Sequence, residues 1–223
     1  MPDAPEAALD LKRVGATALA ELLERYYPTV HRIAFGLCAS AADGTLVFDR
    51  VIARALHAMA SWRDDTAADR WFYHFTVLES RRHAAAATTA QDPLLNADRP
   101  DPAYAAFIRA LRSMPAQQRE SIILSYGERL NPRYLAVAMD CSGQAAENHL
   151  REATRQLAVL TGGQLESLLD ALSHAYRALD PQPGSARPLI QRRIHRHLLP
   201  SRIRRTVIVV CVCVVAYVVW RWV

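Results

Sequence analysis

The chain has 223 residues, of which 51% are hydrophobic, 22% charged and 8% aromatic. This length and apolar content allow one ordinary domain or two small ones and exclude an intrinsically disordered chain. The net charge is +5, but eight arginines and no acidic residue lie beyond residue 186, so residues 1–186 carry 19 basic and 22 acidic side chains, a net of −3. The summed charge of the body therefore excludes broad attraction to nucleic acid, and any such surface must be local.

The first part of the chain has the apolar spacing of three helices. Residues 17–38 carry a helical stripe of Leu, Tyr, Val and Ile side chains. Asp43 and Gly44 are interpreted as a turn, followed by a second helix with its apolar positions between 46 and 62. A third helix is expected to open at Asp65, a good N-cap residue. Together these segments predict a compact three-helix domain.

Residues 88–102 contain three prolines and no helical period, so they are interpreted as an interdomain linker. Further helices are expected at 103–112, from 113 or 114 to just before Gly127, at 131–139 and at 142–160. The last two are joined by a tight turn and have the dimensions of a helix-turn-helix. No alternating pattern suggests a sheet before the tail, so the predicted fold class is all-α, with two small helical domains.

Residues 164–179 form one more amphipathic pattern, and an arginine-rich stretch then precedes an apolar tail at 206–223. As a helix, this tail would be about 27 Å long, short for a bilayer but adequate if Arg221 extends to the interface. The preceding arginines predict a cytoplasmic body anchored to the inner membrane, with the C-terminus outside. An interfacial segment and a Val-rich strand or helix packed on protein are the alternatives.

In a helix-turn-helix, the start of the second helix enters the major groove of DNA. Asn and Gln side chains there can pair with adenine, and Arg can pair with guanine or phosphate. An ordinary helical hairpin is the alternative interpretation, and Glu147 and Glu152 argue against strong nonspecific affinity for DNA.

The two halves also resemble a known family. Residues 106–157, with ALRSMPAQQRE near the start and HLREATRQL at the end, resemble region four of extracytoplasmic-function (ECF) sigma factors. LLERYYPTVHRIA (22–34) and DRWFYHFTVLESRRH (69–83) resemble region two, which ends in a Trp-bearing helix with an Arg pair. The resemblance covers roughly residues 17–160, with both regions in the family's order.

The resemblance implies a factor that binds core RNA polymerase and promoter DNA. By match, the residues facing the minus-ten element are Trp71, Arg81, Arg82 and His83. The residues at the exposed start of the second helix of the helix-turn-helix, which would face the minus-thirty-five element, are Ser142, Gln144, Ala145, Asn148, His149, Arg151 and Arg155. The polymerase contacts would be Asp49, Arg50 and Arg54. From the residues alone, Trp71 could equally be a core side chain and the Arg pair a solvated polar face.

Three departures from the family pattern limit what can be carried over. Residues 45–50 lack the usual acidic pair, Leu78 stands where Asn is common, and Glu147 stands where Lys or Arg is common. One alternative function is therefore a membrane-anchored interaction protein on a degenerate sigma scaffold. Another is a soluble DNA-binding regulator whose tail packs on its own body. An anti-sigma protein or a protease is a further expected class of partner.

The sequence predicts no enzyme, no cofactor and no metal site, because its cysteines and histidines lack ligand spacing. The expected organisation is an N-terminal tail (1–16), a region-two-like domain (17–87), a linker (88–102), a region-four-like domain (103–162), an amphipathic helix (163–180), a Pro/Arg-rich juxtamembrane linker (181–205) and a transmembrane helix (206–223).

Overall fold

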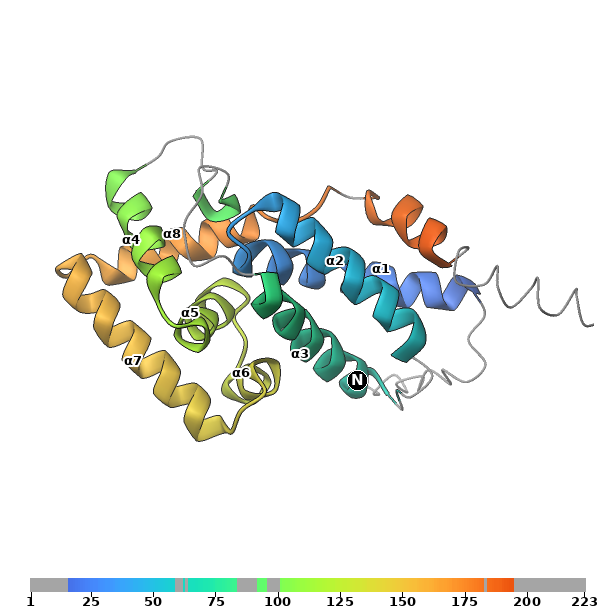
Figure 1. The fold of residues 1–223 in the computed structure, drawn as a ribbon, viewed down its shortest axis with the longest axis horizontal. Helices are drawn as coiled ribbons and strands as arrows, with labels where there is room; N and C mark the ends of the chain where they lie inside the picture. Colours follow the sequence, from blue (N-terminus) through green and yellow to red (C-terminus); the bar gives the residue numbers. More distant parts are fainter. Residues whose placement is uncertain are drawn as a thin grey trace, which may run out of the picture.

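The computed structural model describes residues 16–58, 62, 64–83, 92–95, 101–182 and 184–194, and every regular element within them is helical (Figure 1). This confirms the prediction of an all-α fold class. None of the helices in these ranges combines the length and hydropathy needed to span a membrane. The expected membrane segment, 206–223, and the N-terminal tail up to residue 15 lie outside the described residues.

Three helices, α1 (Ala16–Leu37), α2 (Ala41–Ala58) and α3 (Asp65–His83), surround the first hydrophobic core. Asp43 and Gly44, expected as a turn, instead lie in the first turn of α2. The helix starts earlier because the Ser40 hydroxyl caps it, accepting a hydrogen bond from the backbone N–H of Asp43 (3.1 Å). Gly44 is buried against the ring and backbone of Phe35, a close approach that leaves no room for a β-carbon.

The remaining elements form the second half of the molecule. They are η3 (Pro93–Leu95), α4 (Pro102–Ser113), α5 (Ala116–Ile122), the π-helical turn η4 (Ile123–Gly127), α6 (Pro132–Met139), α7 (Gly143–Thr161) and α8 (Leu165–Arg177). The ranges from α4 onwards agree with the expected helices to within a few residues.

The second hydrophobic core is shared between the two halves. Ile33 and Leu37 of α1 and Val77 of α3 are buried in it, together with side chains from α4 to α8. The two halves, which the sequence predicted as two domains joined by a linker, therefore pack directly against each other.

The expected linker contributes to this packing. Asp92 is fully buried and forms an ion pair with Arg112 of α4, whose side chain is only 1% exposed (2.8 Å). Arg112 also donates hydrogen bonds to the backbone carbonyls of Leu37 and Cys38. A buried guanidinium needs acceptors for its N–H groups, and those of Arg112 come from the linker and from the end of α1. The hydrogen bonds of Arg112 therefore connect α4 to both segments.

Helix α8 joins the two halves. The fully buried ring of Tyr176 packs between Gly36 of α1 and Gly127 of η4, and a β-carbon at either glycine would overlap the ring. Nearby, Arg32 of α1 forms ion pairs with both Glu128 and Asp180. The residue types at 36 and 127 therefore follow from this one tyrosine.

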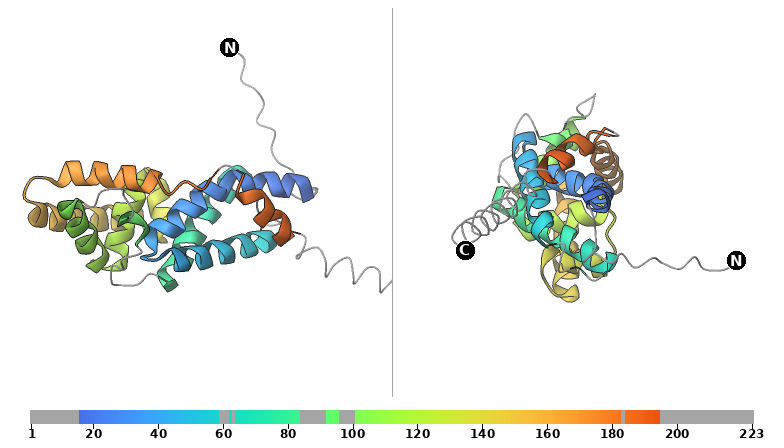
Figure 2. Two further views of the ribbon diagram at one scale, coloured as in Figure 1. Left: turned by 90° about the horizontal axis from the view of Figure 1, so that it is seen from above. Right: turned by 90° about the vertical axis from the view of Figure 1, so that its right-hand side faces the viewer.

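Residues 186–194 form a further helix, although the sequence predicted a linker there. Ala186, Ile190 and Ile194 are buried in the first hydrophobic core. Because they are four residues apart, they share one helix face, and the helix lies beside α1 and α2 (Figure 1, Figure 2). The periodicity was present in the sequence, but it was obscured by the surrounding prolines and arginines.

Candidate nucleic-acid interface

Helices α6 and α7 form a tightly turned pair with well-capped ends. The side chain of Asn131 caps α6 by accepting from the N–H of Tyr134, and Ser142 caps α7 by accepting from the N–H of Ala145. Between them, Asp140 adopts a left-handed conformation (φ 56°), and the N–H of Cys141 donates to the carbonyl of Ala136. This geometry ends α6 sharply and turns the chain directly into α7.

One face of α7 packs on the core and the opposite face is exposed. Ala146, Ala153 and Leu157 are buried. Four of the exposed side chains of α7 lie four, three and four residues apart and form a single stripe, which we call the α7 stripe: Gln144, Asn148, Arg151 and Arg155. The side chain of Glu147 is exposed beside them.

The α7 stripe is connected by short-range contacts. The amide of Gln144 donates to Asn148 (3.2 Å), and Arg151 donates to the same amide oxygen (3.4 Å). Two of the other sequence-predicted residues, Ala145 and His149, are half-buried on the flank of the helix, and Ser142 is exposed at its cap. The structure thus brings four of the seven predicted region-four residues onto one exposed line.

Arg155 is engaged by an acidic neighbour. It donates two hydrogen bonds to Glu152 (2.8 and 2.9 Å), which lower the pKa of Glu152 and raise the pKa of Arg155. Gln156 also donates to Glu152 and lowers its pKa further. Both bonds come from one terminal nitrogen, so a phosphate or base that binds Arg155 must compete with this carboxylate or bind through the other guanidinium N–H groups.

At the end of α3, Arg81 makes contacts to the other half of the molecule. Its guanidinium donates two hydrogen bonds to the buried carboxylate of Glu120 in α5, both 2.8 Å long, and one to the carbonyl of Met139 in α6 (2.6 Å). The hydrogen bonds to Glu120 raise the pKa of Arg81. Arg81 therefore joins α3 to the helix-turn-helix and is three-quarters buried.

The next two predicted residues, Arg82 and His83, meet Arg50 of α2 around a buried carboxylate. Arg82 forms an ion pair with Glu79 (2.7 Å), Arg50 lies 3.8 Å from the same side chain, and Arg50 also contacts the ring of His83. The side chains of Arg50 and Arg82 are about half exposed. Residues predicted for polymerase and for DNA thus share one cationic surface over Glu79.

Trp71 is half-buried at the edge of the first core. Its ring stacks on Phe75, with centroids 4.8 Å apart, and contacts Trp62 at 5.2 Å. The guanidinium of Arg54 lies over the ring of Phe75, 4.9 Å from its centroid. Trp71 is therefore packed against the core and still exposes part of its surface, which combines the two interpretations offered by the sequence.

Asp49 lies apart from the other two predicted polymerase contacts. It pairs with Arg193 of the helix at 186–194 (2.6 Å). Arg50 and Arg54 instead contact groups of α3. The three residues predicted to bind polymerase therefore contact two different elements: Asp49 contacts the helix at 186–194, and the other two contact α3.

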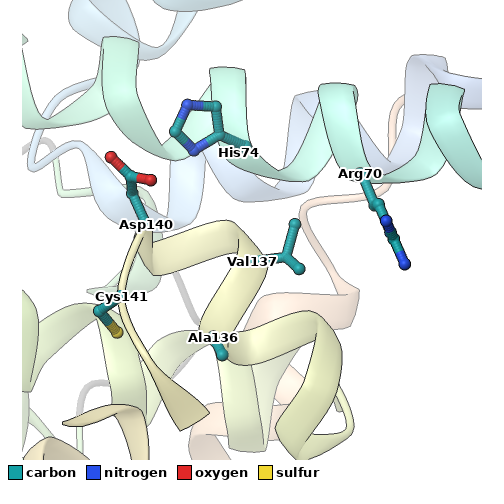
Figure 3. A pocket seen from close by; sticks show the side chains of 6 residues that line it. All are labelled: Arg70, His74, Ala136, Val137, Asp140 and Cys141. Atoms are coloured by element: carbon teal, nitrogen blue, oxygen red, sulfur yellow. The ribbon is translucent and has the colours of Figure 1, made fainter.

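A pocket of about 360 Å³ lies where α3 meets the turn of the helix-turn-helix (Figure 3). Its lining includes Arg70 and His74 of α3 and Asp140 and Cys141 of the turn. Figure 3 shows the Arg70 side chain pointing away from Asp140, with the His74 ring closer to the turn. Arg70 and His74 lie four residues apart on α3 and so share one face, but the sequence assigned neither of them to a binding site.

Comparison with protein-family models, with curated proteins and with solved structures found no match for this chain.

Proposed function

We propose that this chain is a transcription initiation factor of the ECF sigma type, which binds core RNA polymerase and promoter DNA. Its body would lie in the cytoplasm, attached to the inner membrane through residues 206–223. The resemblance of residues 17–160 to regions two and four supports this proposal, as do the all-helical fold and the capped helix pair α6–α7. Its function requires no cofactor and no catalytic residue of its own.

The observation that carries the proposal is the α7 stripe. It presents two amides and two guanidiniums, the groups that read adenine, guanine and phosphate in the major groove, on the exposed face of the second helix of the pair, with the carboxylate of Glu147 beside them. The tight turn at Asp140 leaves the start of this helix exposed, as major-groove docking requires.

A second function is favoured by the contacts of Arg81. A sigma factor would need the end of α3 for melted promoter DNA, yet Arg81 is bound to Glu120 and to the backbone of Met139. This packing favours a membrane-anchored regulatory protein that binds polymerase or another partner without starting transcription.

The test is run-off transcription by core RNA polymerase and the full chain from a library of upstream sequences. The full chain is needed because truncation at residue 186 would remove Ile190 and Ile194 from the first core. Enrichment of a shared two-block element is expected. Polymerase binding without transcripts would instead support the regulatory protein, and absence of both would refute the sigma factor and exclude polymerase as the partner of the regulatory protein.

Variants of the selected promoter complex then test the α7 stripe. Asn148→Ala and Arg151→Ala should each weaken duplex binding by about 1–3 kcal/mol if they contact bases, measured by fluorescence anisotropy. Arg109→Ala, which removes an exposed arginine from α4, is the matched control. Equal affinities in all three variants would contradict the assignment of the stripe.

A further inference from the structure

The helix at 186–194 has two chemically different faces, and both are informative about a partner. On its buried face, Ala186, Ile190 and Ile194 are 9%, 0% and 5% exposed. On the other side, Arg187 and Arg192 are exposed together with Leu189, which is 40% exposed. A short helix with an apolar face and an arginine-rich flank is suited to a membrane interface as well as to a protein surface.

The polar attachments of this helix are two peripheral ion pairs. Arg187 pairs with Glu24 of α1 (3.1 Å) and Arg193 pairs with Asp49 of α2 (2.6 Å). The side chain of Arg187 is 67% exposed and that of Asp49 is 43% exposed. Ion pairs in contact with water contribute little to stability and exchange readily with other anions.

The charge distribution of the sequence indicates which anion could replace Glu24 and Asp49 as the partner of these arginines. Between residues 187 and 205 there are seven arginines and no acidic residue, immediately before the apolar segment 206–223. Clustered arginines beside an apolar segment bind the phosphates of anionic lipids, and the apolar face of the helix can enter the acyl boundary at the same time. A nucleic acid would neutralise the arginines but would leave Ile190 and Ile194 without an apolar environment.

We propose that the helix at 186–194 exchanges between two sites, the surface of α1 and α2 and an anionic lipid surface. In the first state its arginines pair with Asp49 and Glu24 and shield these carboxylates in part. In the second, lipid phosphates replace both carboxylates and the face of α2 that carries Asp49 becomes accessible. The inference rests on the membrane attachment in the proposed function but not on transcription activity.

The experiment compares the full chain in vesicles of phosphatidylcholine alone with the full chain in vesicles that also contain phosphatidylglycerol. Carboxylates are modified with a carbodiimide and an amine, and each site is quantified by mass spectrometry. Asp170, exposed on α8, is the internal reference. On phosphatidylglycerol, labelling of Glu24 and Asp49 relative to Asp170 should rise about two- to threefold, because their side chains are already 30% and 43% exposed in the first state.

Three variants and one change of ligand sharpen the result. Arg192→Gln leaves the pairs with Glu24 and Asp49 in place and should reduce the response, whereas Arg109→Gln should keep it. Ile190→Asp removes the apolar anchor, so it should raise labelling on both kinds of vesicle. Equal labelling on the two lipids, an equal response of R192Q and R109Q, or a rise produced by duplex DNA without vesicles would overturn the inference. Because polymerase is absent, none of these outcomes depends on the transcription assay.

Discussion

The α7 stripe and the end of α3 both carry arginines that the sequence assigned to DNA, yet their surroundings are very different. Arg151 and Arg155 bond to Asn148 and Glu152, three residues away on the same helix. Arg81 bonds to Glu120 and Met139, which are 39 and 58 residues away. Arg151 and Arg155 are therefore held by contacts within one exposed helix, whereas Arg81 is held by contacts between helices.

This difference shows why equal residue types do not make equal sites. An exposed arginine keeps its hydration and can exchange its partner at low cost. A guanidinium that neutralises a buried carboxylate cannot leave without stranding that charge. The α7 stripe is therefore available to a ligand in the observed packing, and Arg81 is available only if α3 separates from α5 and α6.

The largest expected effect is on the free energy of unfolding, and it distinguishes the buried surroundings of Arg81 from the exposed surroundings of Arg155. Arg81→Ala should lower the free energy of unfolding by about 3 kcal/mol, because it leaves the carboxylate of Glu120 buried without its cation. Arg155→Ala, the matched control on α7, should leave the midpoint of urea unfolding unchanged, because Glu152 remains hydrated. Equal midpoints for the two variants would contradict the structural role of Arg81.

A smaller effect is expected from two glycine substitutions, one in α1 beside Tyr176 and one in α7. Gly36→Ala places a β-carbon into the ring of Tyr176 and should cost about 2 kcal/mol through overpacking. Gly143→Ala, in the first turn of α7, meets no atom within 4 Å and should cost nothing in thermal unfolding. A stable G36A variant would mean that Tyr176 does not occupy the space between α1 and η4.

The smallest effect concerns His31, where α1 meets the end of α8. Its ring Nδ1 donates to the carbonyl of Leu179 (2.9 Å), and burial lowers its pKa below the ordinary 6.5 despite this hydrogen bond and nearby Asp180. The unfolded chain therefore takes up a proton first, so stability is complete above pH 6.5 and decreases as the pH falls through the pKa of the folded state.

His31→Gln keeps an amide donor for Leu179 but cannot titrate. Its unfolding free energy should consequently change less than that of the wild type between neutral pH and about pH 5, as measured by urea unfolding. An identical pH dependence in both proteins would show that His31 is not desolvated at this junction.

Much of the helical architecture was predictable because its signals are local. Asn131 before Pro132 and Ser142 after a tight turn are capping signals contained in a few residues, and the structure shows the corresponding hydrogen bonds. The prediction of a turn at Asp43 and Gly44 was wrong because these residue types are compatible with more than one local structure. Asp43 and Gly44 suit a turn, but they also suit a first helical turn when Ser40 provides the cap and Phe35 requires a glycine.

The sequence by itself determined the all-α class and the main helices, because helical periodicity and capping depend on neighbours within about one or two turns. It also assigned Gln144, Asn148, Arg151 and Arg155 to the binding surface of α7, but together with Ala145 and His149, which are half-buried. Only the tertiary structure decided that Arg81 binds Glu120, that Asp49 binds Arg193 and that Tyr176 packs between two glycines. Those contacts join residues far apart in the chain, where no local spacing specifies which partner lies opposite.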